Sequence, residues 1–150
     1  PIRPRYQCLG VYNLKMMRLY NYIYQRLGTN YTIVYTLDGY DEISLTDDCK
    51  IVNNFGEYVY SPQQLGFQRA KQEELWGGTT VEHAAEIFMN VLDNKASDAQ
   101  RNVVVINSAF AIQTRCPEKS LEECKAEAIE SLVGGKAKEA FVKFEEIYHL

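Results

Sequence analysis

The sequence of 150 residues lacks any apolar run long enough to cross a membrane. A membrane-spanning helix needs about 20 consecutive apolar residues, and no stretch approaches that length. A basic segment followed by an apolar one, typical of a secretory signal, is also missing from the N-terminus. We therefore expect a cytoplasmic protein with no membrane contact.

Cysteine and histidine are too few and too scattered for a structural zinc site. The two histidines, His83 and His149, are interpreted as packing or surface residues rather than catalytic bases. Zinc sites need closely spaced ligands, and no C-x-x-C pair occurs. We expect reduced, buried thiols at the four cysteines: Cys8, Cys49, Cys116 and Cys124.

An excess of basic charge is absent as well. Lys and Arg total 16 against 20 Asp and Glu, and the net charge is −4. Binding to nucleic acid requires a basic surface that displaces counterions from phosphates, so a nucleic-acid partner is not expected. The 46% of hydrophobic residues is typical of a folded globular chain, and we interpret residues 1–150 as one structural unit. Common nucleotide-binding and hydrolase motifs such as G-x-G-x-x-G, G-x-x-x-x-G-K-[ST] and G-x-S-x-G do not occur.

The first 60 residues predict a strand, a helix and a second strand, followed by a hairpin. Residues 7–12 form a short apolar run, and residues 31–37 have the continuous β-branched and aromatic pattern of a strand buried on both faces. Between them, Asn13 is a candidate N-cap and Gly28 a candidate end of the helix. Tyrosines widen the apolar stripe of that helix, which predicts that it is covered on more than one side. Residues 50–60 predict two short strands around an Asn-Asn-Phe-Gly turn at the rim of the sheet.

The second half is predicted to be helical. The apolar segment 103–112 is expected to be central, and Gly134 and Gly135 separate the last two helices. The fold class is therefore α/β, with parallel strands, a small hairpin and a helical C-terminal half. Three helix starts have the Ser/Thr-x-x-Glu/Gln pattern of a capping box, formed by Thr79 with Glu82, Ser97 with Gln100, and Ser120 with Glu123.

The segment 38–48 is the strongest candidate for chemistry. It holds five carboxylates in eleven residues directly after a strand predicted to be buried. Ligands gather at the carboxyl ends of parallel strands, and Mg²⁺ binds through one or two carboxylates together with water and phosphate oxygens. Asp41 and Glu42 are the candidate metal ligands. A solvated acidic loop is an equally simple interpretation, whereas an EF-hand is excluded because Ile43 stands where that loop requires glycine.

Several short segments together resemble one enzyme family. They are Leu-Gly-Val-Tyr-Asn at 9–13, Leu-Asp-Gly-Tyr-Asp-Glu-Ile-Ser-Leu-Thr at 37–46, Ser-Pro-Gln-Gln-Leu-Gly at 61–66 and Gly-Gly-Thr at 77–79. In this combination the chain resembles the anthranilate phosphoribosyltransferases over nearly its whole length. The resemblance implies the large α/β domain of the nucleoside phosphorylase and phosphoribosyltransferase type, and corresponds to the C-terminal portion of the enzyme.

The resemblance also implies an activity and a metal site. The reaction transfers phosphoribose from phosphoribosyl pyrophosphate to the amine of anthranilate, with release of pyrophosphate, in tryptophan biosynthesis. In the family the Asp-Glu pair holds Mg²⁺, a role that carries over to Asp41 and Glu42, whereas Asp38 and Gly39 would shape the turn. Tyr35 departs from the family, in which histidine is frequent, and this departure concerns the pocket wall. No catalytic or cofactor-binding residue beyond the metal pair is assigned.

The family's N-terminal helical domain and pyrophosphate loop have no counterpart in the sequence. We therefore expect a piece of the enzyme that is inactive by itself, and a homodimer for the complete enzyme. Two alternatives stay open from the residues: a nucleoside phosphorylase of related fold, which would need no Mg²⁺, and a non-catalytic interaction module that uses the acidic turn and the tyrosine-rich helix.

Overall fold

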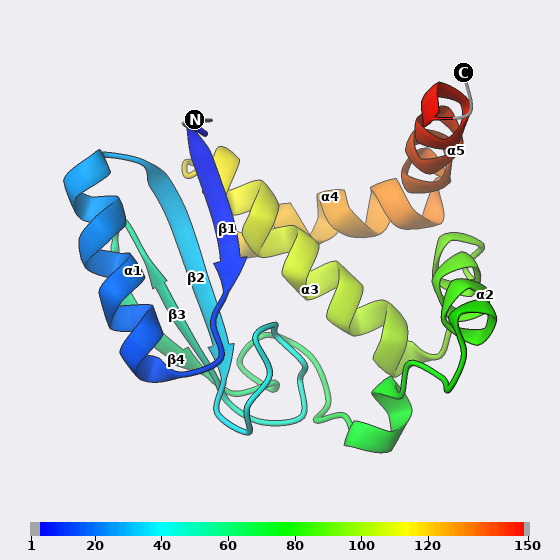
Figure 1. Ribbon diagram of the computed structural model, residues 1–150, viewed down its shortest axis with the longest axis horizontal. Coiled ribbons are helices and arrows are strands. Elements are labelled where there is room, and N and C mark those ends of the chain that lie inside the picture. The colour runs from blue at the N-terminus through cyan, green and yellow to red at the C-terminus, as the bar shows by residue number, and fades with distance from the viewer. Residues whose placement is uncertain (1–3, 149–150) are drawn as a thin grey trace.

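The computed structural model describes residues 4–148, which form a mixed four-stranded sheet followed by a helical half (Figure 1). The strand order is β1-β2-β3-β4, with β1 and β2 parallel and the other pairs antiparallel. The predicted α/β class, the parallel pair and the rim hairpin are confirmed. The elements of this part are β1 (Tyr6–Gly10), α1 (Leu14–Leu27), β2 (Asn30–Thr36), β3 (Cys49–Asn53) and β4 (Gly56–Tyr60).

The two ends of α1 follow the sequence signals. The Asn13 side chain accepts a hydrogen bond from the Met16 N–H at 2.9 Å, and Gly28 ends the helix in the left-handed conformation at φ 63°. In the described part of the chain only one face of α1 is covered, and Tyr22 on the outer face is 55% exposed. The prediction that this helix is covered on more than one side is therefore wrong for residues 4–148, because α3 packs on the opposite face of the sheet.

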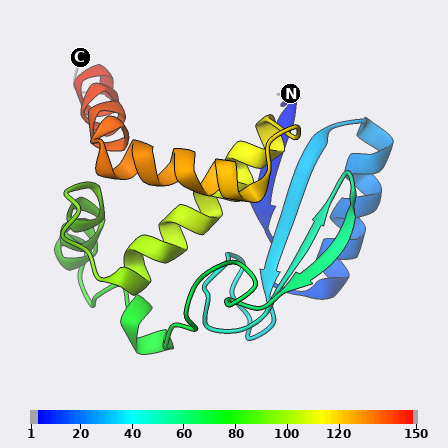
Figure 2. The ribbon, with the colours of Figure 1, turned by 180° about the vertical axis from the view of Figure 1, so that it is seen from behind.

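Strand β2 is buried on both faces, as its continuous apolar pattern predicts. Ile33 packs with Met17 beneath α1, whereas Val34 packs with Ile106 and Phe110 of α3. Figures 1 and 2 show α1 on one side of the sheet and α3 on the other. The sheet therefore has two separate covered faces.

The helical half is built around α3, which leaves the sheet and continues into a second core. Val105 of α3 packs there with Leu92 and Leu132. The expected central position of the apolar segment 103–112 is confirmed. The remaining elements are η1 (Gln72–Leu75), α2 (Val81–Leu92), α3 (Asp98–Arg115), α4 (Leu121–Val133) and α5 (Lys136–Tyr148).

Two of the three predicted capping boxes are present, at Ser97 and at Ser120. The third is absent: Thr80 instead of Thr79 caps α2 by accepting a hydrogen bond from the His83 N–H at 3.2 Å, and histidine at this position returns no bond to the cap. Two consecutive threonines offer the same chemistry, so only the path of the chain after Gly78, which has φ +86°, decides between them.

All four cysteines are free thiols, in agreement with the sequence. Cys49 and Cys124 are buried, but Cys8 is exposed on β1, so the prediction of buried thiols holds only in part. The position of β1 at the edge of the sheet is the reason. None of the helices within residues 4–148 is both long and apolar enough to span a bilayer.

Candidate functional site

The acidic turn, residues 37–48, connects the carboxyl end of β2 to β3 and lies beside the carboxyl end of the parallel strand β1. Thr36, the fully buried last residue of β2, organises its start. The Thr36 hydroxyl donates to the carbonyl of Glu42 at 2.6 Å and accepts from the N–H of Ser44 at 3.3 Å. The turn therefore folds back on the strand that leads into it and has a fixed path.

Three of the five carboxylates in the turn are used by the fold itself. Asp38 accepts a hydrogen bond from the Thr46 hydroxyl at 2.6 Å. Asp47 and Asp48 form ion pairs with the guanidinium of Arg69 at 2.5 and 2.9 Å. The hydrogen bond from Arg69 holds the pKa of Asp47 below its ordinary value. These three side chains shape the turn and are not free to bind a ligand, which agrees with the shaping role expected of Asp38.

Asp41 and Glu42 are different. Both are exposed, and within residues 4–148 no side chain donates a hydrogen bond or forms an ion pair with either carboxylate. The sequence placed all five acids in one group, whereas the structure separates two free carboxylates from three that are paired. The two free ones are the predicted metal ligands.

Gly10, the last residue of β1, allows the turn to approach the sheet. A Cβ atom at this position would lie 1.5 Å from the carbonyl oxygen of Asp41, a distance that no side chain could occupy. Glycine is therefore required here for the contact between β1 and the acidic turn. No local sequence pattern indicates this role of Gly10, because the carbonyl that approaches it lies 31 residues further along the chain.

Asn107 of α3 fixes the turn from the other side. Its Oδ1 accepts from the N–H of Ile43 at 3.1 Å, and its Nδ2 donates to the carbonyl of Ile43 at 2.9 Å and to the carbonyl of Val103 at 2.8 Å. The side-chain amide of Asn107 is therefore fully hydrogen-bonded within the apolar helix α3. Its partner, 64 residues away and adjacent to Glu42, could not be recognised from the sequence.

These elements enclose a cavity of about 320 Å³ on the α3 face of the sheet. Gly10, both free carboxylates, Asn107 and Ser108 border it. Tyr35 is not part of this wall, because Val34 lines the cavity and Tyr35 packs with the α1 cluster.

The donor set of the site suits Mg²⁺ rather than a transition metal. Within residues 4–148 no three His, Cys, Asp or Glu side chains converge, so this chain offers two carboxylates only. Mg²⁺ commonly binds through one or two carboxylates and completes its six oxygens with water and phosphates. The exposed, unpaired oxygens of Asp41 and Glu42 fit that requirement.

The remaining sequence candidates have structural roles. His83 packs edge-on against Trp76 with ring centroids 5.5 Å apart, as expected of a packing histidine. Gly77 and Gly78 form the turn before α2. His149 lies outside the described residues.

Known proteins with similar sequences and structures identify the family of this chain. The profile of the glycosyl transferase family, a/b domain, matches residues 1–138. The chain belongs to this family.

Curated relatives of this glycosyl transferase domain share one name. An anthranilate phosphoribosyltransferase of Bacteroides fragilis is 53% identical over 147 residues, which are 98% of this chain and 44% of the relative. That of Cytophaga hutchinsonii is 46% identical over 143 residues, covering 95% of this chain and 44% of the relative. The chain thus spans less than half the length of the curated relatives it matches.

Solved structures reproduce the fold. The anthranilate phosphoribosyltransferase of Thermus thermophilus has a TM-score of 0.76 at 27% identity, over 86% of this chain and 39% of the other. The Saccharomyces cerevisiae enzyme, in complex with PRPP and Mg, has a TM-score of 0.82 at 20% identity, over 96% of this chain and 42% of the other. At that identity the yeast structure shows the shared fold alone.

Proposed function

We propose that this chain provides the metal-binding part of an anthranilate phosphoribosyltransferase, which transfers phosphoribose from phosphoribosyl pyrophosphate to the amine of anthranilate. The names of the relatives support this assignment. The observation that carries it is the pair of exposed, unpaired carboxylates at the carboxyl end of β2, beside three acids that the fold has already paired. A solvated acidic loop would not need this separation.

In this proposal Asp41 and Glu42 hold Mg²⁺ together with the phosphate oxygens of the substrate. When bound, the metal neutralises the negative charge that develops on the departing pyrophosphate. Asn107 and Thr36 keep the backbone on either side of the pair in place through the bonds described above. The contribution of this chain is a pair of oxygen ligands carried on a backbone that the fold holds in place.

The chain by itself is expected to be inactive, because it spans only 44% of the relatives' length. A site completed by a second part of the enzyme cannot orient the reacting groups when that part is missing. The homodimer implied by the resemblance and the cytoplasmic location expected from the sequence stay predictions. Phosphorolysis of a nucleoside needs no metal pair, so the two free carboxylates favour the transferase over a nucleoside phosphorylase.

The test supplies the missing part. The 150-residue chain is mixed with the remainder of the Bacteroides fragilis relative, and consumption of anthranilate is followed by fluorescence with phosphoribosyl pyrophosphate and Mg²⁺. We expect no turnover from the chain alone and measurable turnover from the mixture. Asp41→Asn is expected to lower the mixture's activity by at least about 100-fold, because loss even of supporting groups at metal sites costs 10- to 100-fold.

Asp48→Asn is the matched control in the same turn. It removes the same charge, but from a carboxylate already paired with Arg69, so the Mg²⁺ concentration for half-maximal activity should change little. Turnover by the 150-residue chain alone would contradict the proposal that a second part of the enzyme completes the site. Equal effects of the two substitutions would show that only the overall charge of the turn matters.

A further inference from the structure

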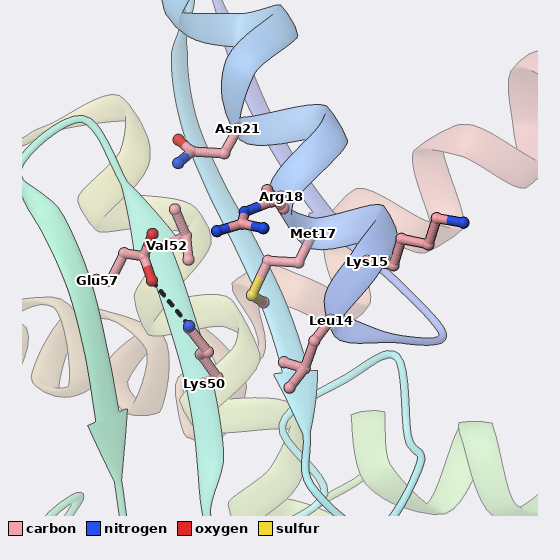
Figure 3. A pocket seen from close by; sticks show the side chains of 8 residues that line it. All are labelled: Leu14, Lys15, Met17, Arg18, Asn21, Lys50, Val52 and Glu57. Carbon is pink, nitrogen blue, oxygen red and sulfur yellow. Dashed lines mark ion pairs between the residues drawn. The ribbon is translucent and has the colours of Figure 1, made fainter.

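A second cavity lies on the α1 face of the sheet, away from the acidic turn. Its volume is about 360 Å³, and α1, β3 and β4 form its walls (Figure 3). Arg18 and Asn21 come from α1, Lys50 and Val52 from β3, and Glu57 from β4. The acidic-turn cavity is lined by α3 instead, so the sheet separates the two.

Asn21 is the most informative residue in this cavity. Its side chain is buried, with only 9% of the residue exposed. Its Oδ1 accepts hydrogen bonds from the Tyr31 hydroxyl and from Gln25 Nε2, which fixes the direction of the amide. Its Nδ2 donates to no group within residues 4–148, and Figure 3 shows the amide turned toward β3. No buried side-chain nitrogen or oxygen within residues 4–148 lacks a hydrogen-bond partner, so this Nδ2 is accessible from the cavity and can donate to a ligand oxygen.

The charges around the cavity also favour an anion. Lys50 pairs with Glu57 at 2.8 Å, which satisfies the one carboxylate in the wall. Arg18 forms no ion pair in the described part of the chain, and Figure 3 shows its guanidinium between Asn21 and Lys50. Three cations, Lys15, Arg18 and Lys50, and one anion therefore line the cavity, although Figure 3 shows Lys15 directed away from the other two.

The rest of the wall consists of Lys15 and three apolar residues. Met17 and Val52 are both buried and line the cavity between the charged groups. A binding pocket for a small molecule typically joins such apolar surface to a few fixed polar groups and measures about 300 to 1,000 Å³. This cavity lies at the small end of that range.

We propose that the α1 cavity is a binding site for a small molecule that carries an oxyanion, a carboxylate or a phosphate group. The guanidinium of Arg18 would bind two of its oxygens, Asn21 Nδ2 would donate to one of them, and Lys50 would lie within reach as a second positive charge. The apolar wall would contact the body of the ligand. This site is independent of the transfer reaction and of the acidic turn.

Two probes test the proposal on the 150-residue chain. Inorganic phosphate and benzoate are titrated separately, and binding is followed by NMR at the side-chain amide of Asn21 and by calorimetry. We expect saturable binding of at least one probe, with the Asn21 signal among those that move. Binding of phosphate alone identifies a phosphate-bearing ligand, and binding of benzoate alone identifies a carboxylate with an apolar body.

Arg18→Gln should weaken that binding by at least about tenfold, because a hydrogen bond to a charged group is lost without a change in the fold. Arg26→Gln is the matched control, since Arg26 lies in the last turn of the same helix and outside the cavity. Asp41→Asn should leave probe binding unchanged. A failure of probe binding would therefore contradict the proposed α1-cavity site without bearing on the proposed transferase function. The absence of saturation with both probes, or equal binding by the two arginine variants, overturns the proposal.

Discussion

Replacing Asn107 by leucine tests whether α3 fixes the acidic turn. The substitution removes all three hydrogen bonds of the amide, two of which satisfy the N–H and the carbonyl of Ile43. Ile43 is only 1% exposed, so water cannot replace those partners unless the turn moves. Leucine is apolar and similar in size, so the change acts through the lost bonds more than through an empty space.

The expected magnitude follows from the two backbone groups left without partners. Each buried, unsatisfied group costs about 1–3 kcal/mol, and leucine recovers a part of that by its own burial. The free energy of unfolding should fall by about 2–4 kcal/mol, a large share of the roughly 5–15 kcal/mol typical of a domain. If the turn moves instead, the loss is smaller but the carboxylate of Glu42 no longer holds its position.

Urea unfolding of the 150-residue chain measures the loss, and the reconstituted activity assay reports the position of the turn. Asn102→Leu is the control, because Asn102 lies in the same helix and its side chain forms no hydrogen bond within residues 4–148. A stability loss of about 0.5 kcal/mol or less for Asn107→Leu, with unchanged dependence of activity on Mg²⁺, would refute the role given to this residue.

Three further perturbations follow from the structure. Gly10→Ala should cost about 1–3 kcal/mol of stability and raise the Mg²⁺ requirement of the reconstituted enzyme, because the new Cβ forces the backbone of Asp41 to move. Arg69→Gln should make the free energy of unfolding depend less on pH at acid pH. The lowered pKa of Asp47 stabilises the fold at pH values above its ordinary pKa near 3.8, and this stabilisation is lost as the pH falls through the lower pKa of the folded state. Urea unfolding between pH 7 and pH 3 measures this dependence. Burial raises the pKa of the Cys49 thiol to about 12, so this thiol should resist alkylation at pH 8 until the chain is unfolded, as peptide mass mapping would show.

Each perturbation has a control in the same chain. Gly77→Ala adds a methyl group where nothing lies within 4 Å and should be neutral, so an equal loss would contradict the argument from the close approach. Arg115→Gln removes an exposed charge that has no ion pair in the described residues, and its acid profile should match that of the unmodified chain. The half-buried Cys116 reports alkylation of a more accessible thiol. Modification of Cys49 at the same rate would show that the sheet does not protect it.

The order and type of the elements were determined by local patterns. Asn13 and Gly28 bounded α1 because a side-chain acceptor at the start and a left-handed glycine at the end satisfy the groups that a helix leaves open. The apolar pattern of residues 31–37 predicted a strand buried on both faces, and the structure confirms it. The sequence also identified the acidic turn, because five carboxylates after such a strand are unusual.

Contacts between distant residues decided the rest. The exposure of the outer face of α1 and the side on which Tyr35 lies both depend on how the chain packs. No local pattern predicts these features, because each is set by a partner many residues away.

The same distinction applies to the candidate site. Asp41 and Glu42 could be named from their sequence context, since adjacent carboxylates after a strand are plausible magnesium ligands. The sequence could not separate them from the three other acids of the turn, because the partners of those acids, such as Arg69, are brought near only by folding. Sequence alone thus determined which residues could bind a metal, and tertiary structure decided which of them are left free to do so.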